Sequence, residues 1–217
     1  MLKGKGPRLS GLFLGREKGG RLVADGVARQ NPKLILTSSK RPDWLPMFIA
    51  HVPSGYILSV SLLERILHAP ASTSAIFWAG MTGALVPDFD LAYFYLVDHR
   101  HTHHHKYFTH WPMFWLLLLT VAMLWLRFDS KSRVALLSWI FCLGCTLHVI
   151  LDSFVGDIWW FAPFINKPFA LFTVQAVFQP WWLNFIWHWS FAVEAGICLW
   201  AGLLYRRRSP MNKSMKT

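Results

Sequence analysis

The chain alternates long apolar runs with short polar segments, and this alternation predicts an all-α membrane protein. Five apolar runs are candidates for membrane spans, at residues 47–63, 75–86, 111–126, 134–151 and 183–205. A helix needs about 20 mostly apolar residues to cross a bilayer, so the first run is marginal in length. No sustained alternation of period two, which would predict strands, interrupts this pattern. We therefore expect a bundle of about four to five transmembrane helices.

The segments outside these runs divide the chain into three expected parts. Residues 1–45 carry ten basic and three acidic side chains, frequent glycine and no apolar run as long as that of a signal sequence. We expect a flexible basic tail there, lying on anionic lipid headgroups; alternatively, translation starts at Met47, where the organised sequence begins. Residues 46–208 are the expected helical membrane domain with its metal site, and residues 209–217 a polar C-terminal tail. Within the domain, the Trp-, Phe- and Pro-rich segment 153–183 is typical of an interfacial or re-entrant layer.

Composition strengthens the membrane prediction. The chain is 54% hydrophobic and 15% charged, against a usual charged share of about 25%, and a soluble domain of this size cannot bury so much apolar surface. The formal charge of +11 favours anionic lipid as the partner over nucleic acid. Basic residues flank both ends of the runs, with a slight excess at the end away from the candidate ligands described below.

The three cysteines lie inside apolar runs, which is a poor framework for disulfides. Cys142 and Cys145 match the C-x-x-C spacing. We interpret them as small residues on a packed helix face, and the alternative is that a thiolate contributes to a metal site.

The polar stretch 98–112 contains six of the ten histidines and suggests the chemistry of the chain. If successive runs cross the membrane in alternating directions, the histidines and aspartates at the run ends all fall at one face. We expect them to hold a divalent metal ion there. The candidate ligands are His51, Asp88, Asp90, His104, His105, His110, His148 and Asp152.

Local spacing supports this set. His148 and Asp152 are four residues apart, so on a helix they share one face; the alternative for His148 is a bond to a backbone carbonyl. Pro87 should end the preceding helix, and if the next three residues are extended, the carboxylates of Asp88 and Asp90 point to the same side. A cation would remove the repulsion between those carboxylates; the alternative is an Asp-rich turn after a helix end.

Within the histidine stretch, the two halves predict different environments. His99, His101 and His103 are typical of a solvated loop, because a zinc site uses only about four ligands. His104, His105 and His110 are better placed, at the mouth of the run that begins at residue 111.

Four motifs in order resemble a known family. They are His51 with Pro53 and Gly55, then 87–90 (Pro-Asp-Phe-Asp), then 105–110 (His-Lys-Tyr-Phe-Thr-His), then His148 with Asp152. This pattern is similar to that of the YdjM-type membrane-bound, predicted metal-dependent hydrolases, a family also described as LexA-binding and inner-membrane-associated. Lys106 stands where that family's pattern has Arg. The resemblance covers about residues 48–152 and implies a multi-pass protein of the bacterial inner membrane.

The chemistry that this set of residues favours is metal-assisted hydrolysis. Mixed imidazole and carboxylate ligands suit zinc first and manganese next. Asp90 or Asp152 would act as general base, and Lys106 would meet an anionic group such as a phosphate. The aromatic segment suits a lipid-like or amphipathic substrate.

Two other classes of function stay open. A metal-handling or transport protein would explain His188 and Glu194 inside the last run, because ionisable residues within membranes are usually functional. A non-catalytic membrane scaffold would use the basic tail to recruit a partner. The clustering of polar groups at one end favours the enzyme.

Overall fold

The computed structural model describes residues 49–66, 69–172, 174, 177–178 and 183–214, with only the backbone described for 209–214. The expected basic tail, residues 1–45, therefore lies outside the described residues. So do residues 215–217 of the expected C-terminal tail.

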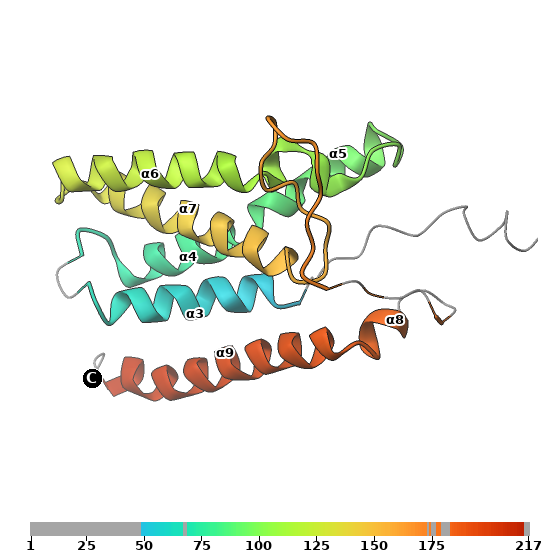
Figure 1. The fold of residues 1–217 in the computed structure, drawn as a ribbon. Helices are drawn as coiled ribbons and strands as arrows, with labels where there is room; N and C mark the ends of the chain where they lie inside the picture. Colours follow the sequence, from blue (N-terminus) through green and yellow to red (C-terminus); the bar gives the residue numbers. More distant parts are fainter. Residues whose placement is uncertain (1–48, 67–68, 173, 175–176, 179–182, 215–217) are drawn as a thin grey trace, which may run out of the picture. The chain divides into compact units, whose positions relative to one another are not determined.

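The five main helices overlap the five apolar runs, which confirms the prediction of an all-helical protein (Figure 1). The last run, 183–205, is divided between α8 and α9, and α9 continues beyond it to Ser214. The described residues contain no strand beyond a single bridge between Ile158 and Phe169. The main helices are α3 His51–Leu63, α4 Thr73–Gly83, α6 Pro112–Phe128, α7 Arg133–Asp152 and α9 Trp189–Ser214. The short elements are η1 Val86–Phe89, α5 Asp90–Leu96, η2 His104–Lys106, η3 Phe108–His110 and α8 Leu183–Ile186.

Length and hydropathy together separate these helices as candidates for crossing a membrane. Among the described residues, α7 alone is long and apolar enough for a span, with a mean hydropathy of 2.2. Helix α6 is apolar but has 17 residues, and α3 and α4 have 13 and 11. The structure therefore has as many main helices as the four to five transmembrane helices expected. How many of them cross the membrane stays a prediction.

Helix α7 is the centre of the bundle. It packs against α6, α4 and α3, and α9 packs mainly on α3 (Figure 1). One apolar cluster joins α4 and α7 at one end of α7, through Ile76, Leu136 and Ile140. A second cluster lies toward the other end of α7, where Trp115 of α6 meets Cys145, Val149 and Ile158.

Glycines let three helices approach one another closely. A Cβ atom on Gly144 would lie 2.6 Å from the carbonyl oxygen of Gly80, and one on Gly55 would lie 2.6 Å from that same oxygen. Cys142 and Cys145 are buried on α7, which agrees with their interpretation as small packed residues. Neither belongs to a potential metal-binding group in the described part of the chain.

The prediction for the segment after Pro87 is half right. Helix α4 ends at Gly83, before the proline, as expected. The following residues are not extended, however: Asp88 lies in the 3-10 turn η1 and Asp90 begins α5. The physical reason is that Pro87, at the start of η1, fixes a φ compatible with a helical turn, and the Asp88 N–H donates to the Leu85 carbonyl at 3.2 Å.

The histidine stretch forms a loop and two short turns. His99 and His101 are exposed, as expected for a solvated loop. The expectation is wrong for His103, which is half-buried and stacks on the His104 ring at 5.5 Å between centroids. Its ring also meets Trp159 at 5.5 Å, so it packs beside the candidate site, because the aromatic segment folds back to this end.

Candidate metal centre

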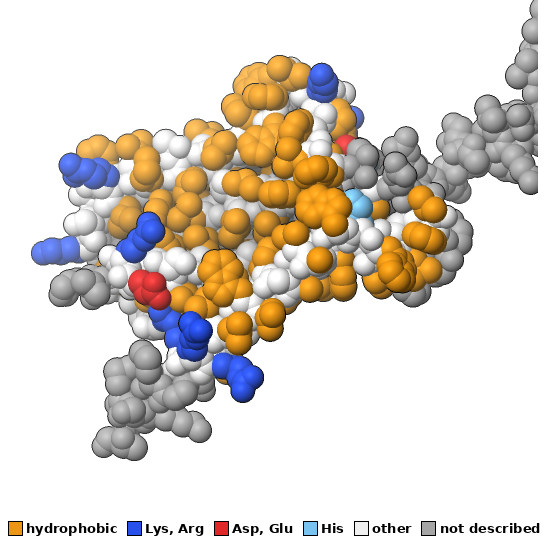
Figure 2. Space-filling model, turned by 60° about the horizontal axis from the view of Figure 1, so that its bottom comes forward, with side chains coloured by type: hydrophobic (Ala, Val, Ile, Leu, Met, Phe, Trp, Pro, Cys, Tyr) orange, Lys and Arg blue, Asp and Glu red, His pale blue; other side chains and the backbone are white. Residues whose placement is uncertain are grey.

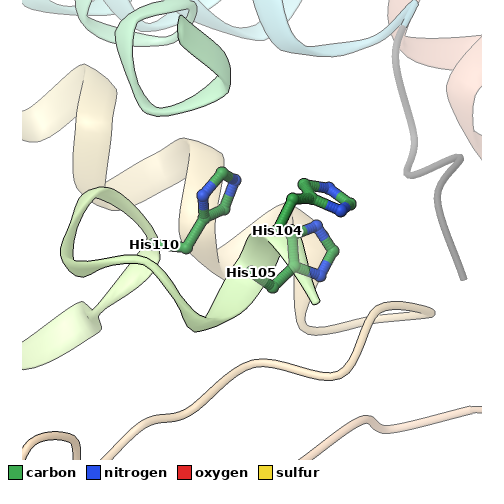
Figure 3. A group of neighbouring side chains, drawn as sticks. All are labelled: His104, His105 and His110. Atoms are coloured by element: carbon green, nitrogen blue, oxygen red, sulfur yellow. The ribbon is translucent and has the colours of Figure 1, made fainter. Parts of the chain in front are cut away.

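All eight predicted ligand residues are buried, with at most 8% of each exposed. They come from six elements. His51 begins α3, Asp90 begins α5, and His148 and Asp152 end α7. Turns η1, η2 and η3 supply the rest: Asp88, His104, His105 and His110. Figure 3 shows the His110 ring beside those of His104 and His105, and the His105 and His110 centroids are 4.7 Å apart.

Asp152 is the centre of the cluster. Its Oδ2 lies 3.0 Å from His148 Nε2, 3.5 Å from His110 Nε2 and 3.8 Å from His105 Nε2. Its Oδ1 lies 3.1 Å from His51 Nε2. Helix α7 thus places one fully buried carboxylate between imidazoles from four other positions in the chain.

Asp88 closes the cluster from the side of η1. Its Oδ1 lies 3.7 Å from His110 Nε2 and 3.6 Å from His148 Nε2. With Asp152 these residues form a group whose ligand atoms all lie within 4.8 Å of one another, and His104, His105 and His110 form a second such group. Ligand bonds of about 2.0–2.3 Å are compatible with these separations, so the cluster can hold a divalent metal ion.

Hydrogen bonds behind two imidazoles orient them toward the cluster. His110 Nδ1 lies 2.7 Å from Asp90 Oδ2, and His148 Nδ1 lies 2.8 Å from the carbonyl oxygen of Ala84. When each ring donates its Nδ1–H to that oxygen, its Nε2 lone pair faces the cluster, which is the usual arrangement behind metal-binding histidines. The carbonyl bond considered as an alternative for His148 is present, and it leaves Nε2 available.

Asp90 therefore contacts the cluster through His110. The Thr109 hydroxyl also donates to its Oδ2. Its Oδ1 is buried and has no hydrogen-bond partner among the described residues.

Several other ligand atoms of the cluster are buried without a hydrogen-bond partner in the part of the chain that the structure describes. They are both ring nitrogens of His51, His104 and His105, Oδ1 of Asp88, and both carboxylate oxygens of Asp152. Leaving a buried polar group unsatisfied costs about 1–3 kcal/mol. A cation bound among these lone pairs would satisfy them together, so the donor set fits a metal ion.

The charges of the cluster also favour a cation. Burial and the neighbouring His110 and His103 rings lower the pKa of His104 to about 3, and burial likewise holds the pKa of His105 well below its ordinary value. Both rings are therefore neutral, which is the form that binds metal. Burial by itself lowers the pKa of His110, but the surrounding carboxylates, Asp152 first, outweigh burial and hold that pKa well above its ordinary value. The carboxylates thus stabilise positive charge at this point.

The remaining predicted residues lie outside the cluster. Lys106 is exposed on η2, beside the buried His105, and its backbone carbonyl accepts the indole N–H of Trp111. His188 Nδ1 is 2.8 Å from the Ser190 hydroxyl, at the start of α9.

Three residues at the site were not singled out from the sequence as its supports. Ala84 offers its backbone carbonyl to His148, and Thr109 donates to Asp90. Gly156 lies against His105, where a Cβ atom would be 2.7 Å from the ring carbon Cε1. Thr109 lies within the quoted motif 105–110, which could have indicated it, whereas Ala84 and Gly156 have no sequence signal of their own.

The protein is therefore a helical bundle in which buried imidazoles and carboxylates, at the ends of its helices, form a candidate divalent-metal centre. The chain belongs to the YdjM inner membrane protein family, whose model matches residues 47–209. This match confirms the resemblance carried by the four motifs and extends it into α9. No curated protein and no solved structure matches the chain.

Proposed function

We propose that the protein is a multi-pass membrane hydrolase that uses a divalent metal ion to cleave a phosphoester or lipid-like substrate. The observation that carries the proposal is the set of buried ligand atoms without hydrogen-bond partners around Asp152. Membership of an inner membrane family supports the bilayer as its environment.

The innermost group supplies the first ligands: Asp88, His110, His148 and Asp152. His51 and His105 approach Asp152 from other directions, and His104 lies beside His105. Mixed imidazole and carboxylate ligands favour zinc, with manganese next. When bound, such an ion lowers the pKa of a water molecule and polarises the bond to be cleaved.

The exposed fraction of the side chain distinguishes the two candidate general bases, Asp90 and Asp152. Asp88 and Asp90 are each 8% exposed, whereas Asp152 is fully buried among imidazoles. In this proposal water and substrate reach the cluster from the side of η1 and α5, and Asp90, which begins α5 and is partly exposed, is the better base. In this proposal Asp152 binds metal, and Lys106, exposed near His105, attracts an anionic substrate group.

The surface on that side supports a substrate with an apolar part. Phe89 of η1 is 64% exposed and Tyr93 of α5 is 52% exposed, and both lie close in sequence to the aspartates. A lipid-like molecule would place its chain against such side chains and its polar ester toward Asp88.

Metal analysis of the detergent-purified protein tests the centre. Wild type should retain zinc, and His110→Ala and Asp88→Ala should lose most of it, because each variant removes a ligand from the innermost group. His99→Ala, in the exposed loop, is the matched control and should bind as wild type does. Unchanged metal content in both ligand variants would refute the proposed centre.

A chelator-sensitive screen of phosphoester and lipid-ester hydrolysis tests the chemistry. Turnover by wild type, lost in Asp90→Asn, is the expected result. Metal binding without turnover on any substrate class would contradict the hydrolase and leave metal handling or a scaffold.

A further inference from the structure

Glu194 is a buried acidic residue that the proposed chemistry does not use. It lies on α9 and is 6% exposed. Its Oε2 accepts the backbone N–H of Ile49 at 3.2 Å, and the N–H of Ala50 faces the same carboxylate. One turn further along α9, the Cys198 thiol donates to the Ile49 carbonyl at 3.4 Å. Helix α9 therefore contacts the backbone immediately before α3.

This contact places a hydrogen-bond acceptor at the start of α3, which has no local side-chain cap. Ala50 occupies the N-cap position of α3, and no side chain caps that helix locally. The N–H groups at the start of a helix need acceptors. Glu194 provides one from a different helix, to the N-cap residue Ala50 and to Ile49 before it.

The first residue of α3 is His51, whose place in the metal cluster depends on that backbone. Its ring is 1% exposed, with Nε2 3.1 Å from Asp152 Oδ1. It also stacks on His148, at 3.9 Å between ring centroids. Both ring nitrogens lack a hydrogen-bond partner among the described residues, so the direction of the ring depends on packing and on the backbone at residues 49–51.

We propose that Glu194 is a positioning residue of the metal centre: it holds the start of α3 so that His51 faces Asp152. The inference rests on the proposed metal function. It makes the packing of α9 on α3 a determinant of metal affinity, although α9 contributes none of the predicted ligands.

The chain offers a matched control at the other end of the same helix pair. Arg208 of α9 donates to Glu64, the C-cap residue of α3, at 3.3 Å. This pair also joins α9 to α3, but at the end of α3 away from His51. Glu64→Gln therefore weakens the contact between the helices without altering the start of α3.

A double-mutant cycle on zinc affinity, measured by chelator competition on the full chain in detergent, tests the proposal. Glu194→Met removes the acceptor at similar length and should weaken zinc binding about 10-fold, as loss of a residue that supports a ligand does. Glu194→Gln keeps an acceptor oxygen and should bind close to wild type, as should Glu64→Gln. In a His51→Ala background, Glu194→Met should have no further effect, because Glu194 acts through His51.

Two results would overturn the inference: wild-type affinity in Glu194→Met, or an equal loss with and without His51. If Glu194→Met does not fold, Glu194→Asp replaces it, since the shorter side chain withdraws the carboxylate from Ile49. The loss of zinc affinity in Glu194→Asp should also vanish in the His51→Ala background.

His110→Ala, measured in parallel, separates the two proposals. If His110→Ala keeps its zinc, the metal centre itself fails, whereas loss of zinc there with full affinity in the Glu194 variants refutes only the positioning role.

Discussion

Asp90 acts on the cluster through the far nitrogen of His110, at 2.7 Å. Replacing it with Ala removes the acceptor that orients the ring and raises its basicity. We expect Asp90→Ala to weaken zinc binding about 10–100-fold, measured by chelator competition. Asp157→Ala, which removes an exposed carboxylate from the segment after α7, should leave the affinity unchanged, and equal affinities in the two variants would contradict the orienting role.

Gly156 offers a second test at the residue scale. A methyl group there would lie 2.7 Å from His105 Cε1, so Gly156→Ala should displace the His105 ring. We expect the free energy of unfolding to fall by about 1–3 kcal/mol, as in other overpacked sites, together with weaker zinc binding. Thermal unfolding in detergent measures the first effect.

Gly196→Ala is the control for that substitution. No atom lies within 4 Å of a Cβ placed on Gly196, in helix α9. Alanine should therefore stabilise the helix slightly, by up to about 1 kcal/mol. A destabilised Gly196→Ala, or a neutral Gly156→Ala, would show that close contact is not the determining factor.

At this scale the sequence indicated which histidines and aspartates lie together, with His103 as the exception, because such residues at run ends have few structural reasons to be buried. It did not predict how the rings are oriented. The partner of His148 is a backbone carbonyl of Ala84, which any residue could offer. The partner of Ile49 is Glu194, 145 residues away, and no local pattern encodes that contact.

At the scale of elements, glycines decide how closely helices approach. Gly144 of α7 faces the backbone of α4, with the Gly80 carbonyl 2.6 Å from a placed Cβ atom and the Ala84 nitrogen 2.9 Å from it. Backbone cannot move aside as a side-chain tip can. Gly144→Ala should therefore force α7 away from α4 and lower the free energy of unfolding by about 1–3 kcal/mol.

Thermal unfolding again measures this effect, with Gly202→Ala as the control. Gly202 lies on α9, where nothing is within 4 Å of a placed Cβ atom. Because Ala84 also holds His148, the Gly144 variant should in addition bind zinc more weakly. Stability equal to that of the control would contradict the close approach of α4 and α7.

Helix positions followed from the sequence because charges, prolines and polar loops separate the apolar runs. The conformation of the turns between the helices could not be predicted in the same way. The extended geometry expected after Pro87 is replaced by η1 and the start of α5, since proline is compatible with a helical turn as well as with extension. Such choices depend on the contacts that the following residues make.

At the scale of the whole molecule, a slight excess of basic residues at the end away from the cluster favours one orientation in the membrane. The end of the bundle away from the cluster carries Arg65, Lys131 and Arg133, and Arg208 lies there through its contact with Glu64. Figure 2 shows Lys and Arg side chains at the edge of an extensive apolar surface. Because cytoplasmic loops of membrane proteins are enriched in Lys and Arg, we expect this end to face the cytoplasm and the cluster to face the opposite side.

Labelling of single cysteines in a cysteine-free chain with a membrane-impermeant reagent tests the orientation. Lys131→Cys, between α6 and α7, should react only after the cells are permeabilised. Lys167→Cys, in the exposed segment after α7, should react in intact cells. Reaction of both on one side would contradict a crossing by α7.

The predicted ligands lie at the starts and ends of α3, α5 and α7 and in the turns between helices. We expect this position to determine when, during folding, the ligand set forms. The ligand set is complete only after His51, which begins α3, has met Asp152, which ends α7. If the cluster binds a metal ion, we expect its capture to be a late step of folding, with the binding energy adding to the stability of the assembled bundle. A chain that has inserted its helices without the ion should still exchange amide hydrogens rapidly at the helix ends that carry the ligands, long after the middle of α7 is protected.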